Sequence, residues 1–187
     1  MLTDRRELRF GADANSASAV RWIDFTIVLQ ASEGPVAFGD TKEGAFALRV
    51  PGPMKIDAGL GGRIVNAAGE ADQAAWGATC EWVAYSGPLT PAGERTTSDA
   101  TLVIMNHPDS AGGDCRWHVR GYGLFAANPF GESDFGGARE RPRRLPAGES
   151  LVFRYRVAIS SVRLSSASTQ ALYNAFRTTA LRAASND

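Results

Sequence analysis

Short runs of alternating apolar and polar residues recur along this chain, and glycine-rich turns separate them. The clearest run is Val20–Ala31, in which Ile23, Phe25, Ile27 and Leu29 alternate with Trp22, Asp24, Thr26 and Val28. Such alternation places the apolar side chains on one face of a β-strand. The 20 glycines fall at regular intervals between runs of this kind, a pattern typical of an all-β sandwich or barrel. We therefore predict an antiparallel β-sandwich.

The same pattern predicts the other strands and one helix. Further strands are expected at residues 7–11, 35–38, 43–50, 63–66, 78–85, 100–105, 115–124 and 150–160. Residues 100–105 are almost wholly apolar, which predicts a central strand, and residues 150–160 form an edge or half-buried strand. A helix is expected over about residues 169–184, with Ser168 as its N-cap, on the outside of the sandwich. No domain boundary is visible, so residues 1–187 form a single domain.

The charge balance excludes several classes of partner. The 187 residues include 20 basic and 20 acidic side chains, for a formal net charge of zero. This argues against nucleic acids and anionic membranes. No apolar run approaches the roughly 20 residues of a membrane helix, and the N-terminus lacks the apolar core of a secretory signal. We expect a cytoplasmic protein with no nucleic-acid and no membrane partner.

The cysteines and histidines give little support for a metal or cofactor. Cys80 and Cys115 fit no zinc spacing and lie in apolar surroundings, so buried free thiols are expected rather than a disulfide. His107 and His118 could pair if their segments are adjacent antiparallel strands, and Asp109 or Glu43 would complete a metal site. No H-x-H or H-E-x-x-H spacing and no glycine-rich cofactor loop supports this. We expect no metal and no cofactor.

One stretch, residues 115–124, concentrates polar side chains that could form a site. Read as a strand, it places on one face Arg116, His118, Arg120 and Tyr122, and on the other Trp117 and Val119. A histidine beside an arginine on an open sheet face can be a general acid with a lowered pKa. The alternative is a surface histidine that is hydrogen-bonded to a neighbouring strand.

Two other segments carry charges that could bind a ligand. In residues 43–50, Glu43 and Arg49 share a face with two small alanines, and a carboxylate near an arginine stays ionised and can act as a base or hydroxyl acceptor. The alternative is a surface ion pair, which contributes little. The long loop 128–146 holds four arginines, which form either a solvated basic loop or a phosphate or carboxylate contact: Arg139, Arg141, Arg143 and Arg144.

Several of these segments, in this order, resemble the bacterial family named "methane oxygenase PmoA" proteins, a domain of unknown function. The resemblance covers about residues 20–160. The segments that carry it are residues 40–50, 62–66, 75–77 and 82–87, Asn106-His107-Pro108, and residues 117–131. Trp117-His118-Val119-Arg120-Gly121-Tyr122 opens the last of them, and it ends at Asn128-Pro129-Phe130-Gly131.

The resemblance implies a galactose-mutarotase-like β-sandwich that holds a sugar or sugar derivative on a concave sheet. Family members are longer, so the chain is expected to match a C-terminal portion of a truncated sandwich. Exposed sheet edges would then favour a homodimer. Where family members usually have Asp-His-Pro, this chain has Asn106-His107-Pro108. The asparagine lacks the carboxylate of the family's aspartate.

These expectations give each candidate residue a role. His118 would act as an acid toward a ring or glycosidic oxygen, and Glu43 as the base. Sugar hydroxyls or a carboxylate would be held by Arg49, Arg120, Tyr122, His107 and Asn128. Trp117 or Trp76 could stack on a sugar face.

Two alternatives remain open. One is a non-catalytic sugar-binding or remnant module that keeps the sheet but not the complete site. The other is a metal-dependent oxidoreductase, as the family name suggests. Neither the substrate nor the reaction type follows from the residues.

Overall fold

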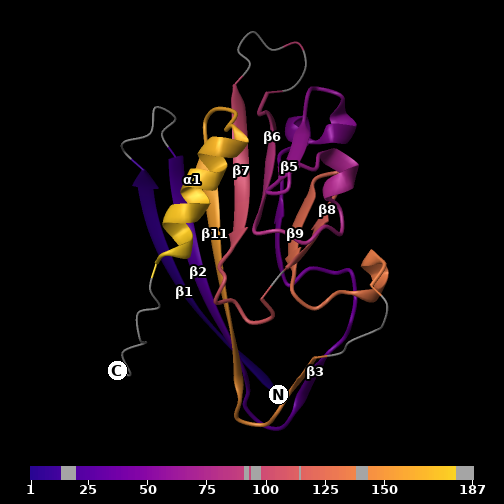
Figure 1. The fold of residues 1–187 in the computed structure, drawn as a ribbon, viewed down its shortest axis with the longest axis vertical. Coiled ribbons are helices and arrows are strands. Elements are labelled where there is room, and N and C mark those ends of the chain that lie inside the picture. The colour runs from indigo at the N-terminus through magenta and orange to yellow at the C-terminus, as the bar shows by residue number, and fades with distance from the viewer. Residues whose placement is uncertain (14–19, 91–92, 94–97, 114, 138–142, 180–187) are drawn as a thin grey trace.

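A computed structural model describes residues 1–13, 20–90, 93, 98–113, 115–137 and 143–179. Within them, antiparallel strands form a large sheet, a small sheet and a two-stranded ribbon (Figure 1). The six strands of the large sheet are, in spatial order, β1 (Leu2–Asp13), β2 (Val20–Ala31), β11 (Ser150–Ser160), β7 (Asp99–Asn106), β6 (Trp82–Pro88) and β5 (Arg63–Asn66). The small sheet has the order β4 (Phe46–Arg49), β9 (Leu124–Asn128) and β8 (Arg116–Val119). The ribbon pairs β10 (Arg143–Leu145) with β3 (Val36–Phe38).

The main core lies between the two sheets, so the all-β sandwich is confirmed. The large sheet contributes Val83, Tyr85, Ile104, Phe153, Tyr155 and Val157, and the small sheet contributes Trp117, Val119, Phe125 and Ala127. Alternation along each strand explains the set, because every second side chain faces the partner sheet. Burying one such large apolar side chain stabilises the fold by about 1.5–3 kcal/mol.

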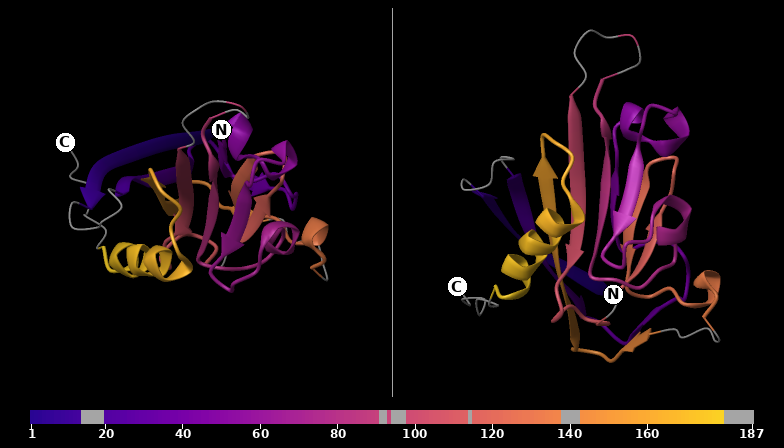
Figure 2. Two further views of the ribbon diagram at one scale, coloured as in Figure 1. Left: turned by 90° about the horizontal axis from the view of Figure 1, so that it is seen from above. Right: turned by 45° about the horizontal axis from the view of Figure 1, so that its top comes forward.

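A second, smaller core lies on the opposite face of the large sheet. There α1 (Ser166–Arg177) packs against β6, β7 and β11 (Figures 1 and 2), and Tyr173 and Phe176 are buried against Trp82 and Met105. A helix on the outside of the sandwich was therefore predicted correctly, but it begins at Ser166 rather than at residue 169 and ends at Arg177. Its N-cap is Ser165, whose side chain accepts a hydrogen bond from the Ser168 backbone N–H at 3.1 Å, not Ser168 itself. The predicted helical residues 180–184 lie outside the described residues.

Three predicted strands have the observed limits: Val20–Ala31, Arg63–Asn66 and Ser150–Ser160. Ser150–Ser160 was predicted to be an edge or half-buried strand. It is not an edge strand, because β2 and β7 pair with its two sides. Its two arginines, Arg154 and Arg156, are each 6% exposed. β1 is longer than expected, and β6 begins and ends later than expected.

The stretch 115–124 is a strand only in its first half. β8 ends at Val119, and a tight turn follows in which the Gly123 N–H donates to the Arg120 carbonyl oxygen at 2.9 Å. Gly123 has φ +95°, a left-handed conformation that favours glycine. Arg120 and Tyr122 therefore belong to the β8–β9 turn rather than to a four-residue polar strand face.

Four short helical turns connect the strands: η1 (Gly52–Met54), η2 (Ile56–Ala58), η3 (Asp72–Ala75) and η4 (Ser133–Phe135). Cys80 and Cys115 are free thiols, as expected. Burial raises the pKa of the Cys80 thiol to about 12 and raises the pKa of Cys115 as well. Among the described residues, no helix has the length and apolarity to span a membrane.

Strand β1 is the most exposed element of the large sheet. No described strand pairs with its outer edge, and Leu8 and Phe10 are exposed on it. Unpaired edges of this kind are templates for association. That a second copy of the chain covers this edge stays a prediction.

Candidate functional site

The outward face of the small sheet carries the predicted site histidine. Trp117 and Val119 point into the core, so His118 between them points outward. In register with it lie Ala126 of β9 and Ala47 of β4. The alanines form a floor of small side chains beside the histidine.

His118 itself is only 4% exposed. Its Nδ1 lies 2.7 Å from the Lys42 carbonyl oxygen, so Nδ1 carries the hydrogen and donates. The ring also contacts Trp76 and Phe135 edge-on, with centroid distances of 6.4 and 6.2 Å. Nε2 makes no hydrogen bond to any described residue and is therefore left with a free lone pair.

Burial is the main cause that lowers the pKa of His118. The positive charges of Arg120 and Lys42 also lower this pKa, whereas the Lys42 carbonyl and the Glu43 carboxylate oppose the shift. A lowered pKa keeps the imidazole neutral at pH 7. In a neutral imidazole with its hydrogen on Nδ1, Nε2 can accept a hydrogen bond or, as a base, a proton.

A backbone strap, defined here as residues 40–44, passes over the alanine floor and covers His118. A Cβ added at Gly44 would lie 2.5 Å from the Ala126 Cβ, so only glycine permits this close approach. The Asn128 side-chain amide donates to the Thr41 carbonyl oxygen at 2.8 Å, and the Asp134 carboxylate accepts from the Lys42 N–H at 2.9 Å. Asn128 is buried and holds the strap in place.

Next to His118, a cleft of 340 Å³ opens between η2, η3 and the β8–β9 turn; we call it the Trp76 cleft. Its lining includes Asp57, Asp72, Gln73, Trp76, Arg120 and Tyr122. The Arg120 guanidinium lies over the Trp76 ring, 5.4 Å from its centroid. The Trp76 Nε1–H is buried and makes no hydrogen bond to any described residue.

Asp72 is the only described non-glycine residue with positive φ, at 53°. Its carboxylate accepts a hydrogen bond from the Ile64 N–H at 3.0 Å, which fixes the start of η3 against β5. Strained backbone of this kind persists where the surroundings fix it. The conformation presents the Asp72 side chain at the wall of the Trp76 cleft.

Arg49 and Glu43 are both exposed and form no ion pair with each other. Arg49 instead lies 5.6 Å from the centroid of the exposed Tyr122 ring. Glu43 belongs to the strap and acts on His118 through its charge. The structure thus places Glu43, Arg49, Arg120, Tyr122 and His118 around one side of the small sheet.

His107 does not join them, and the expected pairing of His107 with His118 was wrong. β7 and β8 belong to different sheets, because the chain crosses to the other layer of the sandwich between them. His107 is 1% exposed and packs edge-on against Phe176 of α1, with ring centroids 5.1 Å apart. No group of three metal-ligating side chains occurs within the described part of the chain.

The sequence did not single out Asp57, Asp72 and Gln73. They lie on two short helical turns that have no periodic pattern, and only the packing of those turns brings them together. Trp76 was one of two aromatic residues considered; the other, Trp117, is fully buried in the core. Arg143 and Arg144 lie in β10, and Arg139 and Arg141 lie outside the described residues.

No curated protein and no solved structure matches this chain. A family model described as "Family of unknown function (DUF6807)" matches residues 1–174. This match extends from β1 into α1 and so includes both layers of the sandwich and the Trp76 cleft. The chain therefore belongs to the DUF6807 family of unknown function.

Proposed function

We propose that the protein binds a monosaccharide-sized carbohydrate or sugar acid in the Trp76 cleft. The observation that carries this proposal is the lining: a tryptophan, a guanidinium, two carboxylates and an amide surround 340 Å³. Small-molecule sites combine an apolar wall with a few convergent polar groups in a volume of this order. A sugar offers ring hydroxyls to the polar groups and an apolar face to an aromatic ring.

Each group has a defined part in this proposal. Asp57 and Asp72 accept hydrogen bonds from hydroxyls, and Gln73 can donate and accept. Arg120 supplies a planar fork suited to a carboxylate or to two neighbouring hydroxyls. Trp76 supplies the aromatic wall of the cleft.

The resemblance described above supports the same ligand class. We propose that the sandwich is of the galactose-mutarotase type and is related to the "methane oxygenase PmoA" proteins. The outward face of the small sheet is then the sugar-facing side. Arg49 and Tyr122 lie at its rim, on the β4 side of the β8–β9 turn.

Catalysis at His118 is the second candidate function, and the free Nε2 favours it. The neutral ring with hydrogen on Nδ1 would accept a proton from a sugar hydroxyl or an activated C–H, so His118 would be the base and not the acid. The imidazolium formed would be stabilised by the Glu43 charge. The burial of His118 under the strap instead favours binding without turnover.

Calorimetric titration with neutral monosaccharides and with uronic acids tests the binding proposal. Wild-type protein should give saturable binding to at least one ligand. Trp76→Ala should weaken it at least about tenfold, whereas Phe10→Ala, which removes an exposed aromatic ring on β1, should leave it unchanged. Arg120→Gln should weaken uronic acids more than neutral sugars, because it removes the charge.

The absence of saturable binding to every ligand in the panel would overturn the proposal, as would equal losses in Trp76→Ala and Phe10→Ala. Turnover of a bound sugar, followed by proton NMR, then separates the two functions. Activity that disappears in His118→Gln while the ligand still binds identifies a catalyst. Binding without turnover in the wild type identifies a binding module.

A further inference from the structure

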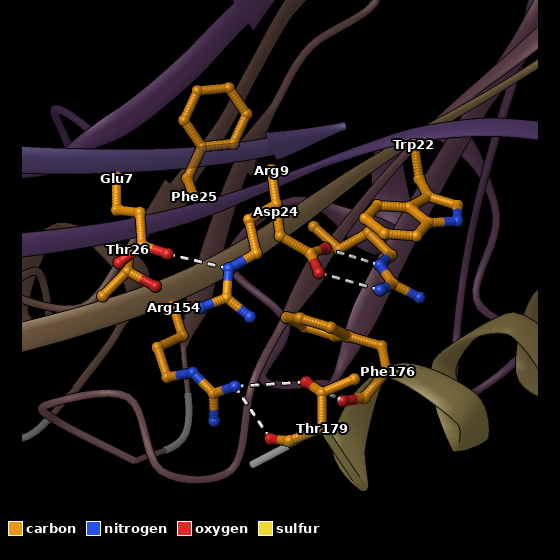
Figure 3. A pocket seen from close by; sticks show the side chains of 10 residues that line it. Glu7, Arg9, Trp22, Asp24, Phe25, Thr26, Arg154, Phe176 and Thr179 are labelled. Atoms are coloured by element: carbon orange, nitrogen blue, oxygen red, sulfur yellow. Dashed lines mark hydrogen bonds and ion pairs between the residues drawn. The ribbon is translucent and has the colours of Figure 1, made fainter. Parts of the chain in front are cut away.

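A second pocket, of 210 Å³, lies on the far face of the large sheet, under the end of α1. Figure 3 shows it between β1, β2, β11 and the helix. Arginines from two strands surround it: Arg9 from β1, and Arg154 and Arg156 from β11. The small sheet does not contribute to it, so it is separate from the Trp76 cleft.

The charge of Arg156 is paired with that of Asp24. Its Nε and a terminal nitrogen donate to the two oxygens of Asp24 at 2.6 and 2.9 Å. The guanidinium also lies between the rings of Trp22 and Phe176, 4.2 and 4.8 Å from their centroids. Asp24 thus pairs directly with Arg156, and its charge also acts on Arg154.

Arg154 is 6% exposed, and among the described residues its carboxylate contact, to Asp109, is a long one. One terminal nitrogen contacts the His107 ring nitrogens at 2.9 and 3.0 Å, and the other donates to the carbonyl and hydroxyl oxygens of Thr179. All of these partners are neutral. The Asp109 carboxylate is 3.6 Å away and its side chain is 63% exposed, so it compensates the buried charge only weakly.

Arg9 brings a second positive charge to the same space. Its Nε donates to Glu7 at 2.8 Å. Its terminal nitrogens make no hydrogen bond to any described residue, and Figure 3 shows the guanidinium pointing into the pocket toward Arg154. Burial is the main cause that lowers the pKa of Arg154; the like charge of Arg9 lowers it further, whereas the Asp109 and Asp24 carboxylates oppose the shift.

We propose that this pocket, the Arg9–Arg154 pocket, binds a small oxyanion between the two guanidiniums, either a phosphate group or a carboxylate. An oxyanion would accept hydrogen bonds from the terminal nitrogens of Arg9 and from the Nε–H of Arg154, which donates to no described residue. Guanidiniums bind such groups in a planar, charge-assisted geometry. The anion would also add negative charge beside the buried Arg154, whose carboxylate contact with Asp109 is long and exposed to solvent.

Isothermal titration calorimetry with inorganic phosphate and, separately, with succinate tests the proposal. The buffer should contain little salt, because salt screens the attraction between the anion and the guanidiniums. At least one anion should bind saturably to the wild-type chain, and the two probes distinguish a phosphate site from a carboxylate site. Arg9→Gln should weaken binding at least about tenfold. The matched control is Arg5→Gln, an exposed arginine on the same face of β1 that lies outside the pocket.

A thermal melt gives a second readout that separates an anion site from a merely structural role of these arginines. The anion should raise the Tm of the wild type and of Arg5→Gln but not that of Arg9→Gln. In anion-free buffer, Arg9→Gln should melt at or above the wild-type temperature, because it removes a repulsion. No saturable binding of either anion, or equal losses in the two variants, would overturn the proposal.

Discussion

The two histidines occupy equivalent-looking environments on opposite sides of the molecule. Both are almost fully buried, and burial is the main cause that lowers the pKa of each. They differ in how their nitrogens are used. The His107 Nδ1 accepts from the Asp109 N–H at 3.1 Å, and its ring also contacts Arg154. His118 has one nitrogen bound to the strap and the other without a described partner.

This difference teaches that burial and a lowered pKa do not by themselves mark a functional histidine. His107 connects the loop after β7 to β11 and α1, which is a structural role. His118 is held in one tautomer and keeps a free acceptor beside a cleft. An unused nitrogen in a fixed ring is the feature to look for at a site.

The largest expected effect is on stability, where His107 and His118 should differ. His107→Ala should lower the free energy of unfolding by about 3 kcal/mol, because it removes packing against Phe176 and leaves Arg154 and the Asp109 N–H without an acceptor. His118→Gln, which nearly preserves volume and can still donate to Lys42, should cost only about 1 kcal/mol. Urea unfolding of both variants measures the difference. Equal losses would mean that His118 is structural too.

The pH dependence of stability should show both histidines together. Each folded-state pKa is lower than the unfolded value near 6.5, so the unfolded chain takes up protons first as the pH falls. Stability should therefore be full above about pH 6.5 and decrease below it, until the pH passes the folded-state pKa values. Urea unfolding between pH 8 and 5 checks this, and each histidine variant should remove part of the slope. An unchanged slope in both variants would contradict it.

The smallest expected effect sharpens the description of the His118 environment. Glu43→Gln should lower the pKa of His118 further, and Arg120→Gln should raise it, because their charges act on the ring in opposite directions. NMR titration of the imidazole protons measures both shifts, with Arg5→Gln as a control that leaves the pKa unchanged. Shifts of the same sign in both variants would show that the charges do not act directly on the ring.

Much of the fold could be predicted because the alternation of apolar and polar residues in a strand involves only residues that are close in the sequence. The limits of β2, β5 and β11 and the inward faces of β4 and β11 follow from which side chains are apolar. The placement of β11 did not follow. An edge position was one of the two predictions, yet the strand lies inside the sheet, and Asp24 and α1 provide partners for its arginines. Only the pairing of distant segments supplies such partners.

The candidate site divides in the same way. The outward direction of His118 follows from alternation along its own segment, whereas its place near Glu43 and Arg49 depends on the pairing of β4, β9 and β8. The strap over His118 depends on one close approach at Gly44 and on the Asn128 amide, and both involve residues far apart in the chain. The Trp76 cleft combines η2, η3 and a hairpin turn, none of which has a repeating pattern to read.

By itself, the sequence determined where most of the strands lie and which of their side chains share a face, because these depend on a two-residue period. The tertiary structure alone decided which faces meet. It separated the two histidines into different layers, buried the arginines of β11 beneath α1 and enclosed both pockets. The physical reason is that strand order and layer packing depend on contacts between residues distant in sequence, which no local period records.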